Sequence, residues 1–327
     1  MKVAVVGGGS WGTTLAAHLV KTGHDVSLLV RDEARRDEIR ARRENPRYLP
    51  GVILPVALRI DSGFGSARGA EMVVVAIPSE SFRAVCRGLA SATSRGAALV
   101  SATKGLEMDT LRRMSEVAAE EGPGRPVAVL SGPSFALEVA LGQPTAVVVA
   151  AAHAAVAEAV QQAFANPTFR VYSSDDVVGV ELAGALKNVI AIAAGIVDGL
   201  GYGQNTVAAL ITRGLAEIGR LGVALGGRPE TFSGLAGLGD LVLTATGALS
   251  RNRRLGQALG AGRSLAEAVR ETVMVAEGVR TTRAACALAE RVRVEMPIAE
   301  QMRAVLYEGR PPREAVDALM IRSLKRE

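Results

Sequence analysis

Residues 2–12 of the chain read KVAVVGGGSWG, and this stretch decides the fold. An apolar run enters glycines with the spacing G-x-G-x-x-G, and a helical pattern follows from Thr13 to Thr22. The spacing alone is a weak signal, and an ordinary glycine-rich turn is the alternative. Its place between a strand and a helix is typical of a dinucleotide-binding loop. We therefore predict a first domain that binds NADP or NAD.

Each residue of this loop has an expected task. Gly7 permits the tight turn, Gly9 lets the backbone approach a pyrophosphate, and Gly12 lets the helix pack close to the strand. The amides around Ser10 and Trp11 would point at the phosphates from the start of the helix.

The end of the second predicted strand bears on the choice of cofactor. Arg31 stands where an arginine accommodates a 2′-phosphate, which favours NADP or the use of both cofactors. We interpret Asp32 as the N-cap of the following helix, Glu33–Arg43, with a contact to the ribose as the alternative.

The alternation of short apolar runs with amphipathic ones predicts an α/β fold. Near-continuous Val/Ala strands indicate a largely parallel sheet in an N-terminal Rossmann-like domain, residues 1–177. After residue 177 we find no convincing strand and expect an all-helical C-terminal domain, residues 178–327. The predicted strands are Lys2–Val6, Asp25–Val30, Met72–Ile77, Ala97–Ala102, Val127–Leu130, Ala146–Ala150 and Phe169–Tyr172. The predicted helices between them include Ser81–Leu89, Thr110–Glu120 and Ala154–Phe164.

Composition excludes several function classes. The net charge is +5, but the basic residues are mixed with acidic ones and no basic stripe with stacking aromatics is present, so we expect no nucleic-acid partner. Cys86 and Cys286 lie too far apart for a metal motif, and we expect no metal site and a reducing compartment. The start of the chain lacks the layout of a signal peptide, and the apolar run Val189–Val197 is too short to cross a bilayer. These features predict a cytoplasmic protein without membrane insertion.

A nicotinamide-dependent dehydrogenase that acts on an alcohol needs a group to accept the hydroxyl proton. The three histidines, His18, His24 and His153, have positions that indicate structural roles. Lys187 is the better candidate, because it stands in an otherwise apolar helix, where burial lowers the pKa of a lysine. A lysine that extends along the helix surface to solvent is the alternative. Lys104, in a glycine-containing segment, is the other lysine of interest.

Eight segments together resemble the bacterial-type NAD(P)-dependent glycerol-3-phosphate dehydrogenases. They occur in that family's order and cover nearly the whole chain, and the ATKG and SRNRR segments are specific to the family. The segments are residues 7–12 (GGGSWG), 101–107 (SATKGLE), 131–136 (SGPSFA), 186–191 (LKNVIA), 210–215 (LITRGL), 237–241 (GLGDL), 250–254 (SRNRR) and 275–278 (VAEG).

The resemblance implies an activity and the residues that carry it. The enzyme would interconvert sn-glycerol 3-phosphate and dihydroxyacetone phosphate and supply glycerol 3-phosphate for phospholipid synthesis, with Lys187 as the proton acceptor. The implied cofactor contacts are Ser10, Trp11, Arg31, Lys104, Ala136, Arg251, Val275 and Glu277. The implied substrate contacts are Lys104, Gly132, Ser134, Lys187, Asp240, Ser250, Arg251 and Asn252. Ser134 stands where many members have threonine, which preserves the hydroxyl.

Physical chemistry supports the last of these contacts without the resemblance. Asp240 follows two glycines in an expected loop, where its carboxylate can hold a lysine ammonium or accept a hydrogen bond from a substrate hydroxyl; a helix N-cap is the alternative. Residues 250–252 begin a helical pattern, and short polar residues with an arginine suit a phosphate dianion there. A capped surface helix is the alternative.

Two other functions remain open from the sequence. A 3-hydroxyacid or 6-phosphogluconate type dehydrogenase also combines a Rossmann domain with helices, but carries Lys and Asn four residues apart, whereas Lys187 and Asn188 are adjacent. A non-catalytic NADP-sensing protein is the alternative from another class, although Lys187 and the Arg251 segment are both present. A homodimer is an open alternative for the assembly.

Overall fold

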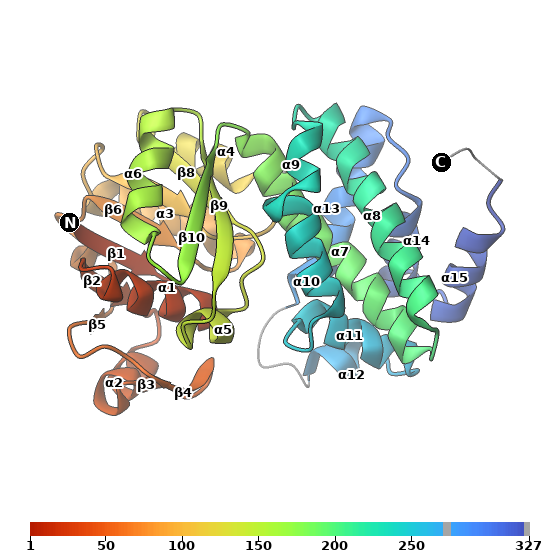
Figure 1. Cartoon of the computed structure of the whole chain (residues 1–327), viewed down its shortest axis with the longest axis horizontal. Helices are drawn as coiled ribbons and strands as arrows, with labels where there is room; N and C mark the ends of the chain where they lie inside the picture. Colours follow the sequence, from red (N-terminus) through yellow and green to blue (C-terminus); the bar gives the residue numbers. More distant parts are fainter. Residues whose placement is uncertain (271–275, 324–327) are drawn as a thin grey trace. The chain divides into compact units, whose positions relative to one another are not determined.

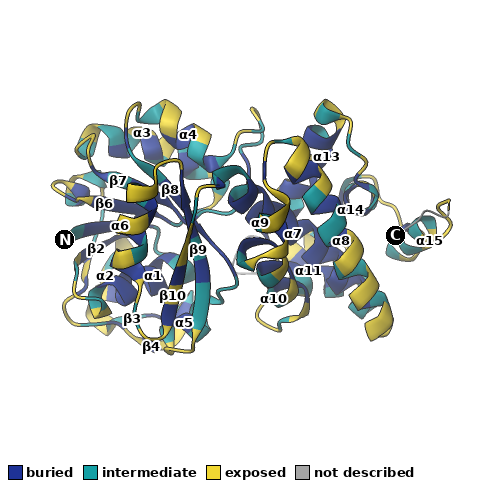
Figure 2. Ribbon diagram, turned by 45° about the horizontal axis from the view of Figure 1, so that its top comes forward, coloured by how far each residue is buried: buried dark blue, intermediate teal, exposed yellow. Residues whose placement is uncertain are grey.

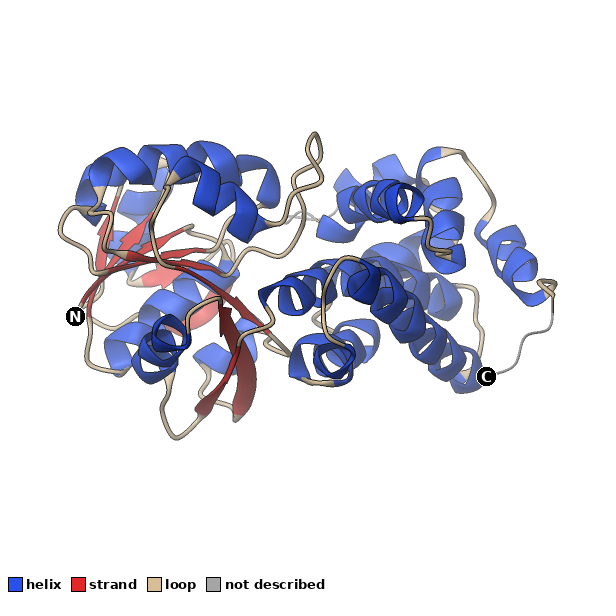
Figure 3. Ribbon diagram, turned by 90° about the horizontal axis from the view of Figure 1, so that it is seen from above, coloured by secondary structure: helices blue, strands red, loops and turns tan. Residues whose placement is uncertain are grey.

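The computed structural model describes residues 1–270 and 276–323. The chain divides into two compact units, the first formed by Met1–Glu107 with Arg112–Glu181 and the second by Met108–Leu111 with Leu182–Glu327. All strands of the described residues lie in the first unit (Figure 3).

A twisted sheet forms the centre of the first unit (Figure 1). Its eight strands are β1 (Lys2–Val6), β2 (Asp25–Leu29), β5 (Arg59–Asp61), β6 (Met72–Val75), β7 (Ala98–Ser101), β8 (Val127–Ser131), β9 (Thr145–Ala151) and β10 (Phe169–Ser174). They lie in the order β10-β9-β8-β7-β6-β1-β2-β5, and every neighbouring pair is parallel except β8 and β9. The chain crosses over between β1 and its two neighbours, so the carboxyl ends of β1, β2 and β6 meet at one edge, where a dinucleotide binds in folds of this type.

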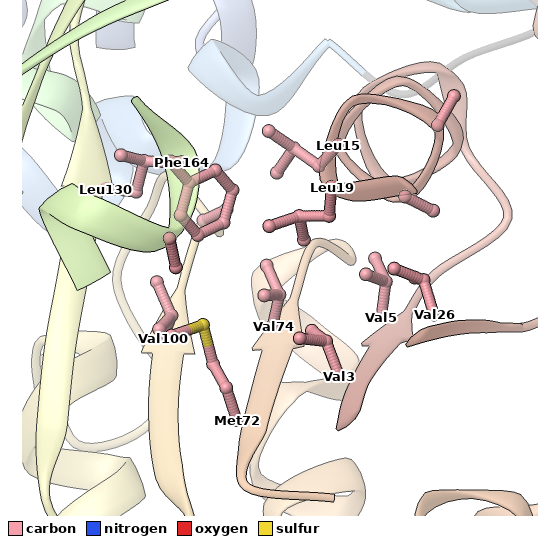
Figure 4. Packing of buried hydrophobic residues seen from close by; sticks show 14 of the residues in the cluster. Val3, Val5, Leu15, Leu19, Val26, Met72, Val74, Val100, Leu130 and Phe164 are labelled. Atoms are coloured by element: carbon pink, nitrogen blue, oxygen red, sulfur yellow. The ribbon is translucent and has the colours of Figure 1, made fainter. Parts of the chain in front are cut away.

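Helices bury both faces of this sheet because alternate strand residues point to opposite sides. On one face, Leu15 and Leu19 of α1 (Ser10–Lys21) and Phe164 of α6 (Ala154–Phe164) pack against Val74 and its neighbours (Figure 4). The opposite face is covered by α3 (Phe82–Ala92) and α4 (Met114–Glu121). The unit also contains α2 (Glu33–Arg42), α5 (Ala136–Ala140), the two-stranded β3 (Glu44–Asn45) and β4 (Leu49–Ile53), and the 3₁₀ turns η1 (Phe64–Ala67) and η2 (Ser79–Ser81).

All regular elements of the second unit are helices in the part of the chain that the structure describes. After α7 (Val177–Gly199) come α8 (Gln204–Ala224), α9 (Pro229–Ser233), the π-helical turn η3 (Leu235–Gly239), α10 (Asp240–Thr246), α11 (Arg251–Gly260), α12 (Leu265–Arg270), α13 (Glu277–Val292), α14 (Pro297–Tyr307) and α15 (Pro312–Met320). The predicted fold class is therefore confirmed.

Several predicted boundaries were wrong for local reasons. Helix α1 begins at Ser10 rather than Thr13, because the last glycines of the loop already lead into its first turn. Helix α4 begins at Met114 rather than Thr110, because Leu111 has a positive φ of 60° and Arg113 is extended. The short elements β3, β4, β5 and α5 have too few residues to show a periodic pattern.

Helix α7 corrects the expectation that no segment is long enough to cross a bilayer. It has 23 residues and is the one described helix that is sufficiently long and apolar for this. However, 94% of the most apolar stretch of this helix is buried, which is typical of a core helix. Figure 2 shows α7 as largely buried.

Candidate functional site

The glycine turn after β1 has the geometry expected of a phosphate-binding loop. Gly7 has a φ of 125°, and its amide donates to the carbonyl oxygen of Leu29 at 3.1 Å. A β-carbon on Gly7 would collide with the carbonyl oxygen of Ala76, and one on Gly12 would collide with that of Gly7. A β-carbon on Gly9 would meet nothing within 4 Å. The turn is therefore closely packed on its inner side and open at Gly9, where a ligand would approach.

The start of α1 follows directly from this turn. Gly9 occupies the N-cap position, where no side chain caps the helix, and the first turn carries no acidic residue. The N–H groups of a helix start that lacks a capping side chain are suited to an anion such as a pyrophosphate. Ser10 and Trp11 are the first two residues of this helix, so their backbone N–H groups lie in its first turn.

Arg31 and Asp32, which follow β2, differ in their surroundings. Asp32 is the N-cap of α2, and its carboxylate accepts a hydrogen bond from the backbone N–H of Arg35 at 2.8 Å. The N-cap interpretation of Asp32 is therefore confirmed. Arg31 is exposed beside it at the carboxyl edge of the sheet.

Three predicted substrate contacts gather at the carboxyl ends of β7 and β8. The ammonium of Lys104 donates to the carbonyl oxygen of Gly132 at 3.3 Å, and the Ser134 hydroxyl donates to the same oxygen at 3.0 Å. Gly132 has a φ of 131°, a conformation that favours glycine. Ala136 begins α5, and its carbonyl oxygen accepts from the Thr14 hydroxyl of α1 at 3.0 Å. The first unit thus brings these four residues to the edge that also carries the glycine turn.

In the second unit, Lys187 lies in a buried polar cluster with Asp240 and Thr244. Its Nζ lies 2.6 Å from Asp240 Oδ1 and 2.6 Å from Thr244 Oγ1. The Thr244 hydroxyl donates to the Asp240 carbonyl oxygen at 2.6 Å. Lys187 is 5% exposed and Asp240 1% exposed. A charge that is buried this deeply requires a partner, and Asp240 supplies it.

The surroundings of Asp240 differ from the expected loop. The preceding glycines belong to the π-helical turn η3, and Asp240 is the first residue of α10 rather than its N-cap. A π turn widens the helix and rotates the residues that follow it. Asp240 and Thr244 then lie one turn apart on the face that meets Lys187.

The segment Ser250-Arg251-Asn252 begins α11 as predicted, but its side chains have separate tasks. Ser250 is the N-cap and accepts from the Arg253 N–H at 3.2 Å. The Asn252 side chain donates to Asn188 Oδ1 at 2.9 Å and accepts from the Gly278 N–H at 3.0 Å. This amide therefore connects α7, α11 and α13, and the backbone N–H of Asn252 lies in the first turn of α11. Arg251, also in that turn, is half-buried.

Two further predicted contacts concern the start of α13. Glu277 is its first residue. Val275 lies outside the described residues.

The histidines have the structural roles that the sequence indicated. His18 Nε2 contacts the Phe164 carbonyl oxygen at 2.6 Å, and burial lowers the pKa of its imidazole. His24 Nε2 contacts the Ala163 carbonyl oxygen at 3.0 Å, and His153 is the N-cap of α6. Burial raises the pKa of the thiols of Cys86 and Cys286 to about 12 and about 11, which makes both poor nucleophiles. Among the residues that the structure describes, no group of three His, Cys, Asp or Glu could hold a metal ion.

Sequence reasoning missed Thr244 and the connecting role of Asn188. Thr244 follows Asp240 by four residues, which is the spacing of neighbours on one helix face. That spacing was the available signal, but Lys187 lies 57 residues away, and only the tertiary structure brings them together.

Comparisons with known proteins cover nearly the whole chain. The family model for the NAD-dependent glycerol-3-phosphate dehydrogenase N-terminus matches residues 2–157, and the model for the C-terminus matches residues 176–317. A glycerol-3-phosphate dehydrogenase [NAD(P)+] from Geobacter sp. (strain M21) is 56% identical over 330 residues, covering 100% of this chain and 98% of the relative. A protein of the same name from Desulfitobacterium hafniense (strain Y51) is 50% identical, covering 100% of this chain and 93% of the relative.

Solved structures give the same result for the fold. The crystal structure of glycerol-3-phosphate dehydrogenase from Coxiella burnetii is 41% identical, with a TM-score of 0.95 over 98% of this chain and 99% of that chain. A ketopantoate reductase structure from Ralstonia eutropha, with 17% identity and a TM-score of 0.63, shares the fold alone.

Proposed function

Because the chain belongs to the NAD-dependent glycerol-3-phosphate dehydrogenase family, we propose that it interconverts sn-glycerol 3-phosphate and dihydroxyacetone phosphate with NAD or NADP. The observation that carries this function is the buried cluster in which Asp240 and Thr244 hold the Lys187 ammonium. A lysine in such surroundings can exchange a proton with a substrate oxygen while water is excluded.

Lys187 performs the proton transfer. When bound, the nicotinamide supplies the hydride acceptor or donor. In the reducing direction, the Lys187 ammonium donates a hydrogen bond to the C2 ketone oxygen and then its proton, as C2 gains the hydride. In the oxidising direction, neutral Lys187 takes the C2 hydroxyl proton as the hydride leaves C2. The short contact with Asp240 is that of an ammonium–carboxylate pair, which is the form required for reduction.

Asp240 and Thr244 keep the Lys187 Nζ in place. The carboxylate and the hydroxyl accept from it in different directions, so its remaining orientation is restricted before substrate arrives. The Thr244 hydroxyl also donates to the backbone carbonyl oxygen of Asp240, so the three side chains form one connected hydrogen-bond network.

The other predicted residues divide between cofactor and substrate. The open position at Gly9 and the uncapped start of α1 fit a pyrophosphate, and Arg31 fits a 2′-phosphate. The cofactor contacts are Gly7, Gly9, Ser10, Trp11, Gly12, Arg31, Lys104, Ala136, Arg251, Val275 and Glu277. The substrate contacts are Lys104, Gly132, Ser134, Lys187, Asp240, Ser250, Arg251 and Asn252.

We assign dinucleotide binding to residues 1–177 and substrate binding with catalysis to residues 178–327. The enzyme acts in the cytoplasm, where its product glycerol 3-phosphate serves phospholipid synthesis. A homodimer stays a prediction. Both alternative functions lose support: the family comparisons favour glycerol 3-phosphate over a 3-hydroxyacid, and a non-catalytic sensor does not need the Lys187 cluster.

The test replaces Lys187 and measures chemistry and cofactor binding separately. Lys187→Ala should lower kcat with dihydroxyacetone phosphate by at least ~10²-fold, because a general acid–base contribution of that size is lost. Trp11 is the only tryptophan and lies in the cofactor loop, so quenching of its fluorescence by NADPH reports binding in the same samples. The affinity for NADPH measured in this way should be the same in Lys187→Ala as in the wild type.

The matched control is Lys21→Ala, which removes an exposed lysine from the last turn of α1 and should leave kcat unchanged. A Lys187→Ala enzyme with near-wild-type kcat would exclude Lys187 as the acid–base group.

A further inference from the structure

The turn that carries Lys104 is held on both sides of that residue. Before it, the Thr103 hydroxyl donates to the Ile77 carbonyl oxygen at 2.9 Å and accepts from the Ile77 N–H at 3.3 Å. After it, Gly105 has a φ of 143°, and a β-carbon there would lie 3.0 Å from Ser79 Oγ. The connection between β6 and α3 therefore supports the turn that follows β7.

Glu107 is the third point of support, and the Arg83 side chain contacts it. Both carboxylate oxygens of Glu107 accept from the guanidinium of Arg83, at 2.7 Å from Nε and 2.7 Å from Nη2. The Glu107 N–H also donates to the Arg112 carbonyl oxygen at 2.9 Å. Side-chain exposure is 27% for Arg83 and 17% for Glu107, so this contact is partly shielded from solvent.

Arg83 is itself fixed by α4. Its Nη1 lies 2.9 Å from Glu121 and its Nη2 lies 2.8 Å from Glu120. The contacts with Glu107 and, after it, Glu121 raise the pKa of the guanidinium. Arg87, one turn later on α3, pairs with Glu121 at 2.9 Å. Arg83 is thus held by α4 as well as by Glu107.

We propose that Arg83 is a positioning residue for the reaction: its two-pronged contact with Glu107 holds the Lys104–Glu107 turn so that the Lys104 ammonium lies at the substrate. This inference rests on the proposed function, in which Lys104 contacts the phosphorylated substrate. The contact to the Gly132 carbonyl oxygen, at 3.3 Å, shows where the ammonium lies when the turn is held. The two parallel hydrogen bonds fix the orientation of the Glu107 carboxylate relative to the guanidinium.

The chemistry of the contact requires arginine. A lysine at position 83 would keep the charge but could not engage both oxygens of Glu107 in one plane. Arg83→Lys should therefore behave more like Arg83→Ala than like the wild type. Glu107→Gln removes the charge from the other partner with little change in shape, and it provides a second variant if Arg83→Ala folds poorly.

The experiment is a cycle of variants in the full-length enzyme, with kcat and KM for dihydroxyacetone phosphate as readouts. Arg83→Ala should lower kcat/KM by ~10-fold, because a displaced binding group is costly even when it remains present. In the Lys104→Ala background, the same substitution should have almost no further effect, since the group that it positions is gone. Arg87→Ala is the matched control and should leave kcat/KM unchanged in both backgrounds.

The outcomes separate this inference from the proposed function. If Lys104→Ala is impaired but Arg83→Ala is normal, or is equally harmful with and without Lys104, the positioning role is wrong and the proposed function stands. If Lys104→Ala has normal kinetics, the placement of Lys104 at the substrate is wrong, and the positioning role falls with it. Thermal unfolding of each variant identifies losses of activity that come from a destabilised fold. Glu107→Gln must also lower kcat/KM when Lys104 is present and have almost no effect in the Lys104→Ala background.

Discussion

Arg31 and Asp32 are neighbours in sequence, yet the structure uses them in different ways. The Asp32 carboxylate accepts a hydrogen bond from the start of α2, so it is engaged in a structural contact. Arg31 is the cation at the same edge of the sheet and is exposed. This division favours a site that reads a 2′-phosphate through arginine.

Substitution of Arg31 should therefore change cofactor preference. Arg31→Asp should raise KM for NADPH by at least ~10-fold, because a hydrogen bond between charged groups is replaced by repulsion. KM for NADH should change far less. Arg42→Asp removes the same charge from the exposed last turn of α2 and serves as the control. Equal effects of Arg31→Asp on both cofactors would show that Arg31 does not contact the phosphate.

Single residues also show where sequence reasoning ends. Gly7, Gly12 and Lys187 could be proposed as site residues from the sequence because each departs from its surroundings: the glycines have a fixed spacing, and the lysine is one cation in an apolar helix. The buried amide of Asn252 could not be assigned, because a polar residue at a helix start is equally common on a surface. Its contacts to Asn188 and Gly278 depend on the packing of three helices, which no local pattern encodes.

Among the elements, α7 and α11 pack with their backbones in contact. Gly195 and Gly199 of α7 face Gly256 and Gly260 of α11. A β-carbon on any of the four would collide with backbone atoms of the opposite helix. This close approach holds the start of α11, with Arg251, against the helix that carries Lys187.

An added methyl group should separate these helices. Gly195→Ala and Gly256→Ala should each lower the free energy of unfolding by ~1–3 kcal/mol, because overpacking in a tight contact has that cost. They should also lower kcat/KM for dihydroxyacetone phosphate. Gly203→Ala is the matched control, since Gly203 has a φ of −81° and a β-carbon there would meet nothing within 4 Å. Urea denaturation measures the difference, and equal stability of all three variants would contradict the role of the contact.

Longer helices and strands could be predicted from the sequence more readily than short ones. The buried strands β1, β6 and β7 show as short apolar runs, and the helix α6 matches its predicted bounds. The three-residue strand β5 could not be found, because it has no periodicity of its own and pairs with β2 only at the sheet edge. The π turn before Asp240 was missed for a related reason: its glycines resemble those of a loop.

At the scale of the whole molecule, each unit contains a buried carboxylate whose charge is unfavourable. In the first unit, burial raises the pKa of Glu181, which is held by Arg113 and Ser115. In the second, burial raises the pKa of Glu217 to about 7, although the amides of Ile298 and Ala299 donate to it and oppose the shift.

The Glu217 shift predicts how stability depends on pH. Below its ordinary pKa of 4.5, the carboxyl is protonated in both the folded and the unfolded chain. Between 4.5 and about 7 the folded chain binds more protons, so the free energy of unfolding falls as the pH rises. At 1.36 kcal/mol per pKa unit, the loss is ~3 kcal/mol.

Glu217→Gln removes this titration while the rest of the chain is unchanged. From acid to neutral pH, the wild type should lose stability relative to the variant, because only the wild type has a carboxyl group at this position that must ionise. Buried His18 acts in the opposite direction, because its lowered pKa reduces stability as the pH falls, but it contributes equally to both proteins. Parallel pH profiles of the two proteins would contradict the prediction.

The apolar length of α7 has a consequence for biosynthesis. Helices α8, α11 and α13 all approach α7, and α13 ends roughly 90 residues after α7 does. At ~5–20 residues per second, a ribosome adds those residues in ~5–20 seconds. Throughout that interval the nascent chain carries a segment that, by length and composition, could enter a membrane. The helix that carries Lys187 therefore requires protection until the helices that cover it have been made.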